Sequence, residues 1–549
     1  MLLRLRSIVA LAVAAVAPCA CHSGTEPEGQ PQEEEPVVVA RVDVRVDAEA
    51  ERSPISPFIY GSNQDRGTDR WTVRRYGGNR LTGYNWETNV SNAGSDWQHS
   101  SDLFLLSDAG IPEGEAAIPA RAVTHFHDRS VAMGAASIVT LQMAGYVAAD
   151  GAGPVQPSEA APSARWVKVE PRRTAPAAAA ATPDLGDGVA YMDELVTLLV
   201  DRYGGASSPQ GVRWYSLDNE PALWAHTHPR IHPEPVRAED LVERSIALAS
   251  AVKDVDPNAE ILGPALYGMS AYVSLQDAPD WNAVRGGHDW FIDFYLDRMR
   301  QAEQDSGRRL LDVLDVHWYP EARGDHRITE GDATTASDQD ARMQAPRTLW
   351  DPGYRENSWI GEWMGAYLPL LPRLRESIDR HYPGTRLAIT EYDYGGGNTV
   401  SGGLAQADVL GIFGKHGVHV ATLWGIAPSD TYVAAAFDLY RDYDGQGSGF
   451  GSTSVRATTS DPASLAVYAS IEGEDPSVLH LILLNRNREG ALDVRITIAG
   501  TGGYTSGQVW SFDGLSATIS RKDEPIVRAG DTLGYVLPSL TAAHLVLGR

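Results

Sequence analysis

Apolar and polar positions follow a repeating pattern along most of this chain. From about residue 40 to residue 440, short apolar or β-branched runs alternate with stretches in which apolar residues recur every three or four positions. The short runs predict strands and the longer stretches predict amphipathic helices. The predicted strands are Ile55–Ser62, Thr72–Asn79, Ala136–Ala144, Val212–Asn219, Glu260–Ala265, Val313–Trp318, Leu387–Glu391 and His419–Trp424.

Amphipathic helices are predicted between these strands. Eight strand–helix repeats favour an α/β fold, a (β/α)₈ TIM-like barrel, which we place at residues 51–445. The active site of such a barrel forms at the carboxyl ends of its strands, so side chains at those ends are the candidates for chemistry. The predicted helices include Ala190–Tyr203, Glu239–Val255, Trp290–Gln304, Leu371–His381 and Leu404–His416.

The pattern of apolar and polar residues changes after Gly445. Short strands separated by Gly, Asn, Asp and Ser turns predict a C-terminal β-sandwich at residues 446–549. The alternating segment Val37–Val46, within residues 37–50, precedes the barrel and is expected to add an edge strand to this sandwich. The strands predicted in the sandwich are Leu465–Ile471, Val478–Asn485, Asp493–Ile498, Gly507–Phe512, Gly534–Leu537 and Ala543–Leu547.

The first 21 residues have the layout of an export signal. Arg4 and Arg6 precede an apolar run that is too short to span a bilayer as a helix. Cys19 and Cys21 follow that run, and the pattern resembles a bacterial lipoprotein signal in which Cys21 becomes lipidated. Residues 22–36, rich in Glu and Pro, predict a flexible acidic linker. The expected location is extracellular, or the outer-membrane surface through an N-terminal lipid anchor.

Composition narrows the classes of function. The chain of 549 residues has 72 acidic and 46 basic side chains, a formal net charge of −26, and such a field repels phosphate backbones. We therefore expect no nucleic-acid partner. The two cysteines of the sequence are those of the signal, so the remaining chain holds no disulfide. We expect a monomer.

Two glutamates come at the ends of predicted barrel strands. Glu220 follows the fourth strand in WYSLDNEPALW, and Glu391 ends the seventh strand in LAITEYDYGGG. They lie three strands apart around the barrel, so they are expected to face each other across its mouth. Paired carboxylates about 5–5.5 Å apart suit a retaining glycosidase, in which one is the acid/base and the other the nucleophile. Taken singly, either glutamate is also compatible with a solvated strand end.

The chain resembles glycoside hydrolase family 44, a family of endo-β-1,4-glucanases that also attack xyloglucan. The strings that carry the resemblance run along the barrel: ISPFIYGSN (55–63), RRYGGNRLTGYNWE (74–87), WYSLDNEPALW (214–224), DVHWYP (315–320), ITEYDYGG (389–396) and AAFDLYRDYDGQGSGFG (435–451). The resemblance implies a TIM-like barrel beside a β-sandwich. It also implies that Glu220 is the acid/base and Glu391 the nucleophile of a double displacement.

Supporting roles follow from the wider clan of retaining barrel glycosidases. Asn219 is expected to bind the sugar 2-hydroxyl, a contact that strengthens in the transition state. By the same resemblance, Arg75, His317 and Tyr319 orient the nucleophile and keep it ionised. A structural ion pair for Arg75 and a satisfied core position for His317 are the alternatives.

Tryptophans are the other candidates for sugar binding, because pyranose faces lie flat on aromatic rings. By resemblance Trp424, at the end of the eighth strand, stacks the sugar next to the scissile bond. Trp86, Trp318 and Trp363 fall near strand ends or in the loops beyond and are also named as substrate-binding candidates. About half of the tryptophans near strand ends are expected to fill the core instead.

The sequence thus predicts an exported, retaining endo-β-1,4-glucanase that hydrolyses soluble β-glucans such as carboxymethylcellulose and xyloglucan. The alternatives are a retaining barrel hydrolase acting on xylan or mannan, and a glycan-binding surface lipoprotein without activity. Catalysis is expected to require no cofactor. The resemblance allows a structural Ca²⁺, for which the sequence identifies no ligands.

Overall fold

The computed structural model describes residues 37–63, 71–174, 180–499, 503–504, 506–522, 526–529 and 532–549. Within it, Val38–Arg549 form one compact unit. The predicted signal at 1–21 and linker at 22–36 lie outside the described residues. In the described part of the chain, no helix is both long enough and apolar enough to cross a membrane.

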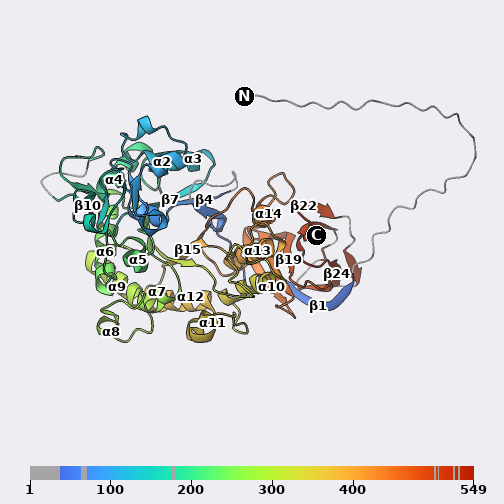
Figure 1. Ribbon diagram of the computed structural model, residues 1–549. Coiled ribbons are helices and arrows are strands. Elements are labelled where there is room, and N and C mark those ends of the chain that lie inside the picture. Colours follow the sequence, from blue (N-terminus) through green and yellow to red (C-terminus); the bar gives the residue numbers. More distant parts are fainter. Residues whose placement is uncertain are drawn as a thin grey trace, which may run out of the picture. The chain divides into compact units, whose positions relative to one another are not determined.

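Eight parallel strands of the described chain close a barrel, as predicted (Figure 1). Each strand pairs with its neighbour in chain order, and the last pairs with the first. The carboxyl ends of all eight strands therefore lie at one end of the barrel, where the predicted site residues also fall. The strands are β3 (Gly61–Asn63), β4 (Val73–Tyr76), β7 (Ala136–Leu141), β12 (Trp214–Leu217), β13 (Glu260–Leu266), β14 (Val313–Trp318), β15 (Arg386–Tyr392) and β16 (Val420–Leu423).

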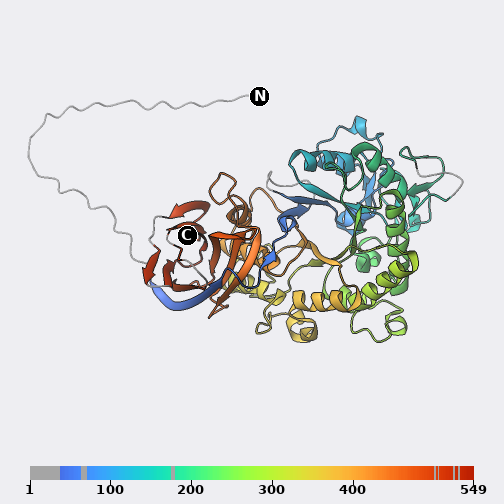
Figure 2. The ribbon, with the colours of Figure 1, turned by 180° about the vertical axis from the view of Figure 1, so that it is seen from behind.

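Helices follow the strands and cover the outside of the barrel (Figures 1 and 2). Their buried faces carry the three- and four-residue apolar spacing that predicted them. The longer ones are α3 (Arg121–Ala132), α4 (Met192–Tyr203), α6 (Ala238–Val255), α9 (Phe291–Ser306), α10 (Ala336–Gln344), α12 (Leu370–His381), α13 (Val400–Lys415) and α14 (Thr431–Arg441). Short helices lie in the loops: α1 (Asn79–Thr82), α2 (Phe104–Asp108), α5 (Trp224–Thr227), α7 (Met269–Ser274), α8 (Trp281–Val284) and α11 (Trp359–Trp363).

Small strands extend two of the loops at the catalytic end. One three-stranded sheet belongs to the loops after β4 and β7, and a second builds the rest of the loop after β7. They give these long loops backbone hydrogen bonds of their own. The strands are β5 (Ser91–Asn92), β6 (Ser100–Asp102) and β9 (Gly153–Pro154) in the first sheet, and β8 (Tyr146–Ala148), β10 (Trp166–Glu170) and β11 (Val189–Tyr191) in the second.

The first barrel strand is shorter than predicted. Pro57 begins a 3₁₀ helix, η1 (Pro57–Ile59), and the Ser56 hydroxyl accepts a hydrogen bond from the Phe58 amide at its start. Proline favours such a first helical position, so the chain becomes extended only from Gly61 onward. A side chain at Gly61 would collide with the carbonyl oxygen of Ala421, so glycine lets the first and last strands approach.

The interior of the barrel differs between its two ends. The end opposite the strand carboxyl ends is filled by an apolar cluster, which Phe58 of η1 partly covers. The other end holds buried polar side chains instead. The apolar cluster comprises Val73, Ile138, Trp214, Leu262, Val313, Ala388 and Val420, and the polar set includes Asn63, Arg75, Asn219, His317 and Glu391. The apolar cluster thus fills the end of the barrel away from the candidate site.

The C-terminal domain is a mostly antiparallel sheet that curls around its own apolar core. Its hydrogen-bonded order is β22-β21-β25-β19-β18-β17-β1-β20-β24-β23, with β2 beside β17. The strands are β1 (Val38–Asp47), β2 (Ser53–Pro54), β17 (Thr453–Thr459), β18 (Leu465–Glu472), β19 (Asp475–Asn485), β20 (Ala491–Ala499), β21 (Ser506–Asp513), β22 (Ser516–Lys522), β23 (Val527–Ala529), β24 (Thr532–Leu537) and β25 (Ala542–Gly548).

The N-terminal strand β1 lies inside this sheet and not at its edge, which corrects the expectation from the sequence. It pairs with β17 on one side and with β20 on the other, the latter in parallel (Figure 1, blue among red). Its inward residues Val42, Val44 and Val46 are buried in the core of the domain. The two ends of the described chain are therefore part of one domain.

Helix α13 joins the barrel to the sheet domain. Asp408 of this helix forms a buried ion pair with Arg486 and accepts a hydrogen bond from the Tyr468 hydroxyl at 2.6 Å. Apolar residues on the same face of β18 and β19, Ala466 and Ile482 among them, belong to the large core shared with the helices. Both faces of β18 up to Ile471, and of β19 from Leu479 onward, are buried, which explains the nearly continuous apolar sequence there.

Candidate active site

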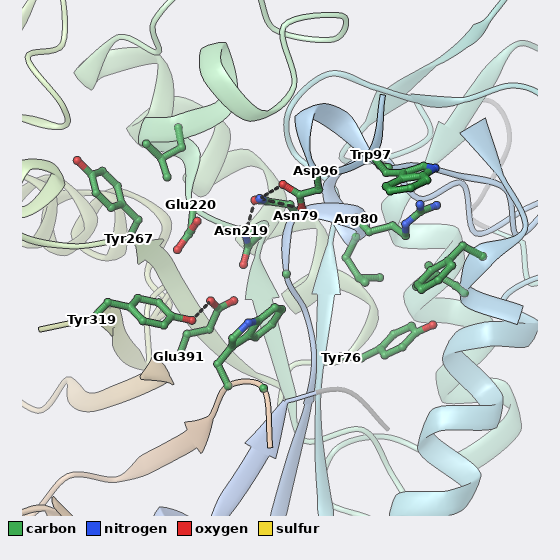
Figure 3. A pocket seen from close by; sticks show the side chains of 18 of the residues that line it. Tyr76, Asn79, Arg80, Asp96, Trp97, Asn219, Glu220, Tyr267, Tyr319 and Glu391 are labelled. Carbon is green, nitrogen blue, oxygen red and sulfur yellow. Dashed lines mark hydrogen bonds between the residues drawn. The ribbon is translucent and has the colours of Figure 1, made fainter. Parts of the chain in front are cut away.

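A cavity of about 1080 Å³ opens at the carboxyl ends of the barrel strands (Figure 3). Glu220 and Glu391 both line it, together with side chains from the loops after β4, β13 and β14. The two glutamates predicted from the sequence as catalytic residues therefore meet in this cavity. Its other lining residues include Asn79, Asp96, Trp97, Asn219, Tyr267, Tyr319, Trp359 and Trp424.

Glu220 is held in a left-handed backbone conformation just after β12. Its φ is 43°, that of Asp218 is 59°, and the Glu220 amide donates to the carbonyl of Ala265 on the neighbouring strand at 3.1 Å. Left-handed backbone is unfavourable for residues other than glycine and is found mainly where surrounding contacts enforce it. Asp218 supplies such contacts, since its buried carboxylate accepts hydrogen bonds from the Thr82 hydroxyl and the amides of Met143 and Ala144.

Glu391, at the end of β15, accepts hydrogen bonds from two donors. The Arg75 guanidinium donates to one carboxylate oxygen at 2.7 Å, and the Tyr319 hydroxyl donates to the other at 2.9 Å. Arg75 also donates to Asn63 and to the side-chain oxygen of Asn219. The carboxylate is 4% exposed, so its charge is balanced by a buried arginine and its orientation is fixed from both sides.

His317 lies between the two glutamates. Its Nδ1 is 2.8 Å from Oε1 of Glu220 and 3.5 Å from Oε2 of Glu391, whereas its Nε2 has no hydrogen-bond partner in the described part of the chain. Burial lowers the pKa of His317 to about 3. The imidazole is therefore neutral at neutral pH and acts as a hydrogen-bonding spacer between the carboxyl groups.

The two carboxyl groups have different environments. The pKa of Glu220 is raised to about 7, mainly by burial; Arg75 opposes the rise and the nearby charge of Asp96 adds to it. Glu391 instead contacts the positive charge of Arg75 directly. One carboxyl group is thus disposed to carry a proton near neutral pH while the other is paired as an anion, a division of roles typical of acid and nucleophile.

Glu220 and Glu391 are close enough to act on one bond. Single side-chain atoms of Glu220, His317 and Glu391 all lie within 4.8 Å of one another. Retaining glycosidases place their carboxyl groups about 5–5.5 Å apart, and inverting enzymes about 6.5–9.5 Å apart to admit a water molecule. This close approach is nearer to the retaining spacing than to the inverting one, which favours direct attack by one carboxylate.

The supporting polar residues named from the sequence, Asn219, Arg75, His317 and Tyr319, all meet at this centre. Sequence reasoning missed Asn63, Asn79 and Asp96. Asn79 ends the string GGN just after β4 and could have been found there. Asp96 could not, because only the folding of the loop after β4 brings it to the cavity.

About half of the tryptophans near strand ends fill the core, as expected, but the sequence did not show which ones. Trp424 is half-buried and lines the cavity, whereas Trp86 and Trp318 are fully buried in the core and are wrong as sugar-binding residues. Trp363 is 68% exposed and is not among the cavity-lining residues. Trp97 and Trp359 line the cavity in their place. Ring burial depends on how the loops fold over each strand end, which the sequence alone does not show.

No calcium site is defined by these residues. Ca²⁺ takes six to eight oxygen ligands, and the close His, Asp and Glu group found among the described residues is Glu220, His317 and Glu391. That group contributes a nitrogen and two carboxyl groups that already have partners. The structural Ca²⁺ that the resemblance allows therefore stays without assigned ligands.

Comparisons with known proteins agree with this arrangement. The family model described as glycoside hydrolase family 44 matches residues 90–322. Endoglucanase A of Paenibacillus lautus is 55% identical over 504 residues, which cover 91% of this chain and 72% of that protein. Two solved structures have TM-scores of 0.90, cover 93% of this chain and are fully covered by it: a family 44 endoglucanase from Clostridium thermocellum, 56% identical, and a family 44 xyloglucanase from Paenibacillus polymyxa, 52% identical. The barrel carries this carboxylate pair, and the similarity extends over almost the whole chain. The chain therefore belongs to glycoside hydrolase family 44.

Proposed function

We propose that this protein is an endo-β-1,4-glucanase that hydrolyses internal bonds of soluble β-glucans, xyloglucan included, with retention of anomeric configuration. The observation that carries the proposal is the pair Glu220 and Glu391, which lie close together with opposite surroundings in one cavity. The names of the similar proteins, endoglucanase and xyloglucanase, support the substrate class.

In the first step, an oxygen of the Glu391 carboxylate attacks the anomeric carbon while the glycosidic C–O bond breaks. Glu220 gives its proton to the departing oxygen, so the leaving chain departs as a neutral alcohol. Arg75 and Tyr319 hold Glu391 so that one oxygen faces the sugar. The product of this step is an α-linked glycosyl ester on Glu391.

In the second step, the ionised Glu220 takes a proton from water, and the water oxygen attacks the anomeric carbon. The ester bond to Glu391 breaks and the β-configured sugar is released. Glu220 is protonated again and Glu391 is again a carboxylate paired with Arg75. No cofactor takes part in either step, because both proton transfers use the carboxyl groups of the chain.

Substrate contacts are supplied by aromatic and amide side chains along the cavity. Trp97, Trp359 and Trp424 come from three different loops and offer apolar faces for sugar rings. Asn219, beside the acid, is placed to bind the hydroxyl at carbon 2 of the reacting sugar. A cavity open over residues from several loops suits a polymer bound through its length, which favours internal cleavage.

The test is release of reducing sugar from carboxymethylcellulose, xyloglucan, xylan and mannan by residues 37–549, run beside Glu220→Gln and Glu391→Gln. We expect the native chain to cleave the first two, with a rapid fall in viscosity, and both variants to be inactive. Cleavage confined to xylan or mannan would replace the substrate class. Binding without cleavage would support the alternative of a glycan-binding protein.

We further propose that the protein is exported, with Cys21 as the site of a lipid anchor, and that it acts as a monomer. The support for export and for the anchor is the sequence of residues 1–21. Metabolic labelling with a fatty acid in a bacterial host, comparing the native chain with Cys21→Ser, tests the anchor. Label that persists in Cys21→Ser would refute it.

A further inference from the structure

The carboxamide of Asn219 can in principle point either way, because its oxygen and nitrogen ends have the same shape. Here its hydrogen-bond partners determine which way it points. Its Oδ1 accepts a hydrogen bond from Nη2 of Arg75 at 2.9 Å, and its Nδ2 donates to Oδ1 of Asn79 at 3.2 Å. An arginine can only donate, so the oxygen end of Asn219 must face Arg75 and the amino end must face Asn79.

The same question then applies to Asn79. Its Nδ2 lies 3.3 Å from each carboxylate oxygen of Asp96 (Figure 3). An ionised carboxylate can only accept, so the amino end of Asn79 faces Asp96 and its oxygen end faces Asn219. The two carboxamides therefore form a directed chain between an anion, Asp96, and a cation, Arg75, which in turn binds Glu391.

Asp96 is an exposed side chain on a well-fixed loop. It lies on the 3₁₀ helix η2 (Gly94–Trp97), whose first amide donates to the Asn92 side chain at 2.9 Å. Gly94 has φ 56° and packs so closely on Thr227 that an added Cβ would lie 2.2 Å from its carbonyl oxygen. Thr227 ends α5, the helix that follows Glu220. The loop of Asp96 and the loop of the proposed acid thus pack directly on each other.

We propose that Asp96 is a positioning residue for glycoside cleavage: through Asn79 it holds a fixed acceptor against the amino end of Asn219 and so aims the second N–H group of that carboxamide at the 2-hydroxyl of the reacting sugar. The Nδ2 of Asn219 has two hydrogens and makes one hydrogen bond in the described part of the chain, so one N–H is available in the cavity. The inference rests on the proposed function and names a residue outside the carboxylate pair.

The chemical consequence concerns the transition state. Contacts to the 2-hydroxyl strengthen as positive charge develops at the anomeric carbon, so a misdirected carboxamide lowers the rate more than it weakens binding. Without Asp96, Asn79 can rotate its carboxamide and present either end to Asn219. Arg75 still holds the oxygen end of Asn219, but the amino end of Asn219 loses its fixed acceptor.

The test uses an aryl β-cellobioside and its analogue without the 2-hydroxyl on the reacting sugar. Asp96→Ala should lower kcat on the hydroxylated substrate about 10-fold, the value of roughly one hydrogen bond, with KM changed less than about 2-fold. On the 2-deoxy substrate the variant and the native enzyme should differ little. The kcat of Asp96→Asn on the hydroxylated substrate should lie between those of Asp96→Ala and the native enzyme, because an asparagine side chain can donate as well as accept.

A double-mutant cycle separates this role from direct sugar binding. If Asp96 acts through Asn219, the variant with both Asp96→Ala and Asn219→Ala should be no slower than Asn219→Ala alone. If the rate losses of the two single variants multiply in the double variant, Asp96 acts on the sugar or the fold directly and the inference is overturned. Equal rate losses of Asp96→Ala on both substrates would lead to the same conclusion. Ser95→Ala is the matched control, because it changes the same exposed turn without touching Asn79. It should leave both substrates unaffected.

The outcomes also separate the inference from the function it rests on. A native enzyme inactive on every β-glucan and aryl substrate would refute the proposed function. An active native enzyme whose Asp96→Ala variant keeps its full discrimination between the two substrates would refute the positioning role alone.

Discussion

Replacing Glu220 by glutamine removes the buried acid while keeping the shape of its side chain. In the native chain, burial raises the pKa of Glu220 from its ordinary 4.5 to about 7. The side chain is 13% exposed, so solvent screens the effect only weakly. Glutamine cannot ionise, so the variant should differ from the native protein in activity and also in how its stability depends on pH.

The magnitude follows from linkage between ionisation and folding. A carboxyl group whose pKa is higher in the folded state stabilises the fold fully below pH 4.5 and loses that contribution as pH rises to about 7. At about 1.4 kcal/mol per pKa unit, the cost of ionisation above pH 7 is on the order of 3 kcal/mol. The free energy of unfolding of Glu220→Gln, relative to native, should therefore rise by this amount between pH 4.5 and pH 8.

Activity should change with the leaving group. Loss of a general acid typically lowers rates 10²–10⁴-fold, but a dinitrophenolate leaving group needs no proton. For Glu220→Gln, kcat/KM on xyloglucan should fall by that factor, while kcat/KM on a dinitrophenyl β-cellobioside should fall less than about 10-fold. In the native enzyme, kcat/KM on the polymer should decline as pH rises through about 7, because the acid loses its proton.

The assays are urea unfolding at pH 4.5 and pH 8 and initial rates on both substrates. Glu362→Gln is the matched control, since Glu362 is exposed on α11 and the same substitution there should change neither quantity. Equal loss of rate on both substrates, or a stability difference that does not grow with pH, would refute the reasoning about the buried acid.

Four further changes test other parts of the account. Glu391→Ala should be inactive alone but should form an α-glycosyl azide when azide is added; a β-azide would contradict the assigned nucleophile. Tyr319→Phe removes the 2.9 Å hydrogen bond to Glu391 and should lower kcat about 10-fold, and an unchanged kcat would show that Arg75 suffices. Trp424→Ala should lower kcat/KM on xyloglucan about 10-fold through loss of ring stacking, measured by initial rates; a change confined to thermal stability would instead indicate a packing role. Asp408→Ala leaves Arg486 buried without its partner and should reduce the free energy of unfolding by about 3–5 kcal/mol; a loss below about 1 kcal/mol would show that the interface between barrel and sheet domain tolerates the charge.

The barrel could be predicted from the sequence because its signals are local and repeated. Most strand candidates are short apolar or β-branched runs, and each helix candidate shows helical spacing. The strand β17 (Thr453–Thr459) was missed because only Val455 and Ala457 mark its buried face among Thr, Ser and Arg. The interior position of β1 depends on pairing with β20, more than 400 residues later, which no local pattern reveals.

The candidate site was predictable where it sits on strand ends and not where it sits in loops. Glu220 and Glu391 end strands, so the barrel topology alone places them together. How deeply they lie depends on the loops that pack over the strand ends, and burial is the main cause of the raised pKa of Glu220. Asp96 and the division of the tryptophans depend on loops whose paths are set by tertiary packing.

The central claim is a covalent intermediate on Glu391, and trapping it is the most direct test. The enzyme would be incubated with a 2-deoxy-2-fluoro-β-cellobiosyl fluoride, digested, and mapped by mass spectrometry. We expect one labelled peptide, carrying the fluorocellobiosyl group on Glu391, together with loss of activity. A label on Glu220 or on another carboxyl group, or direct release of the α-configured product without any label, would contradict it.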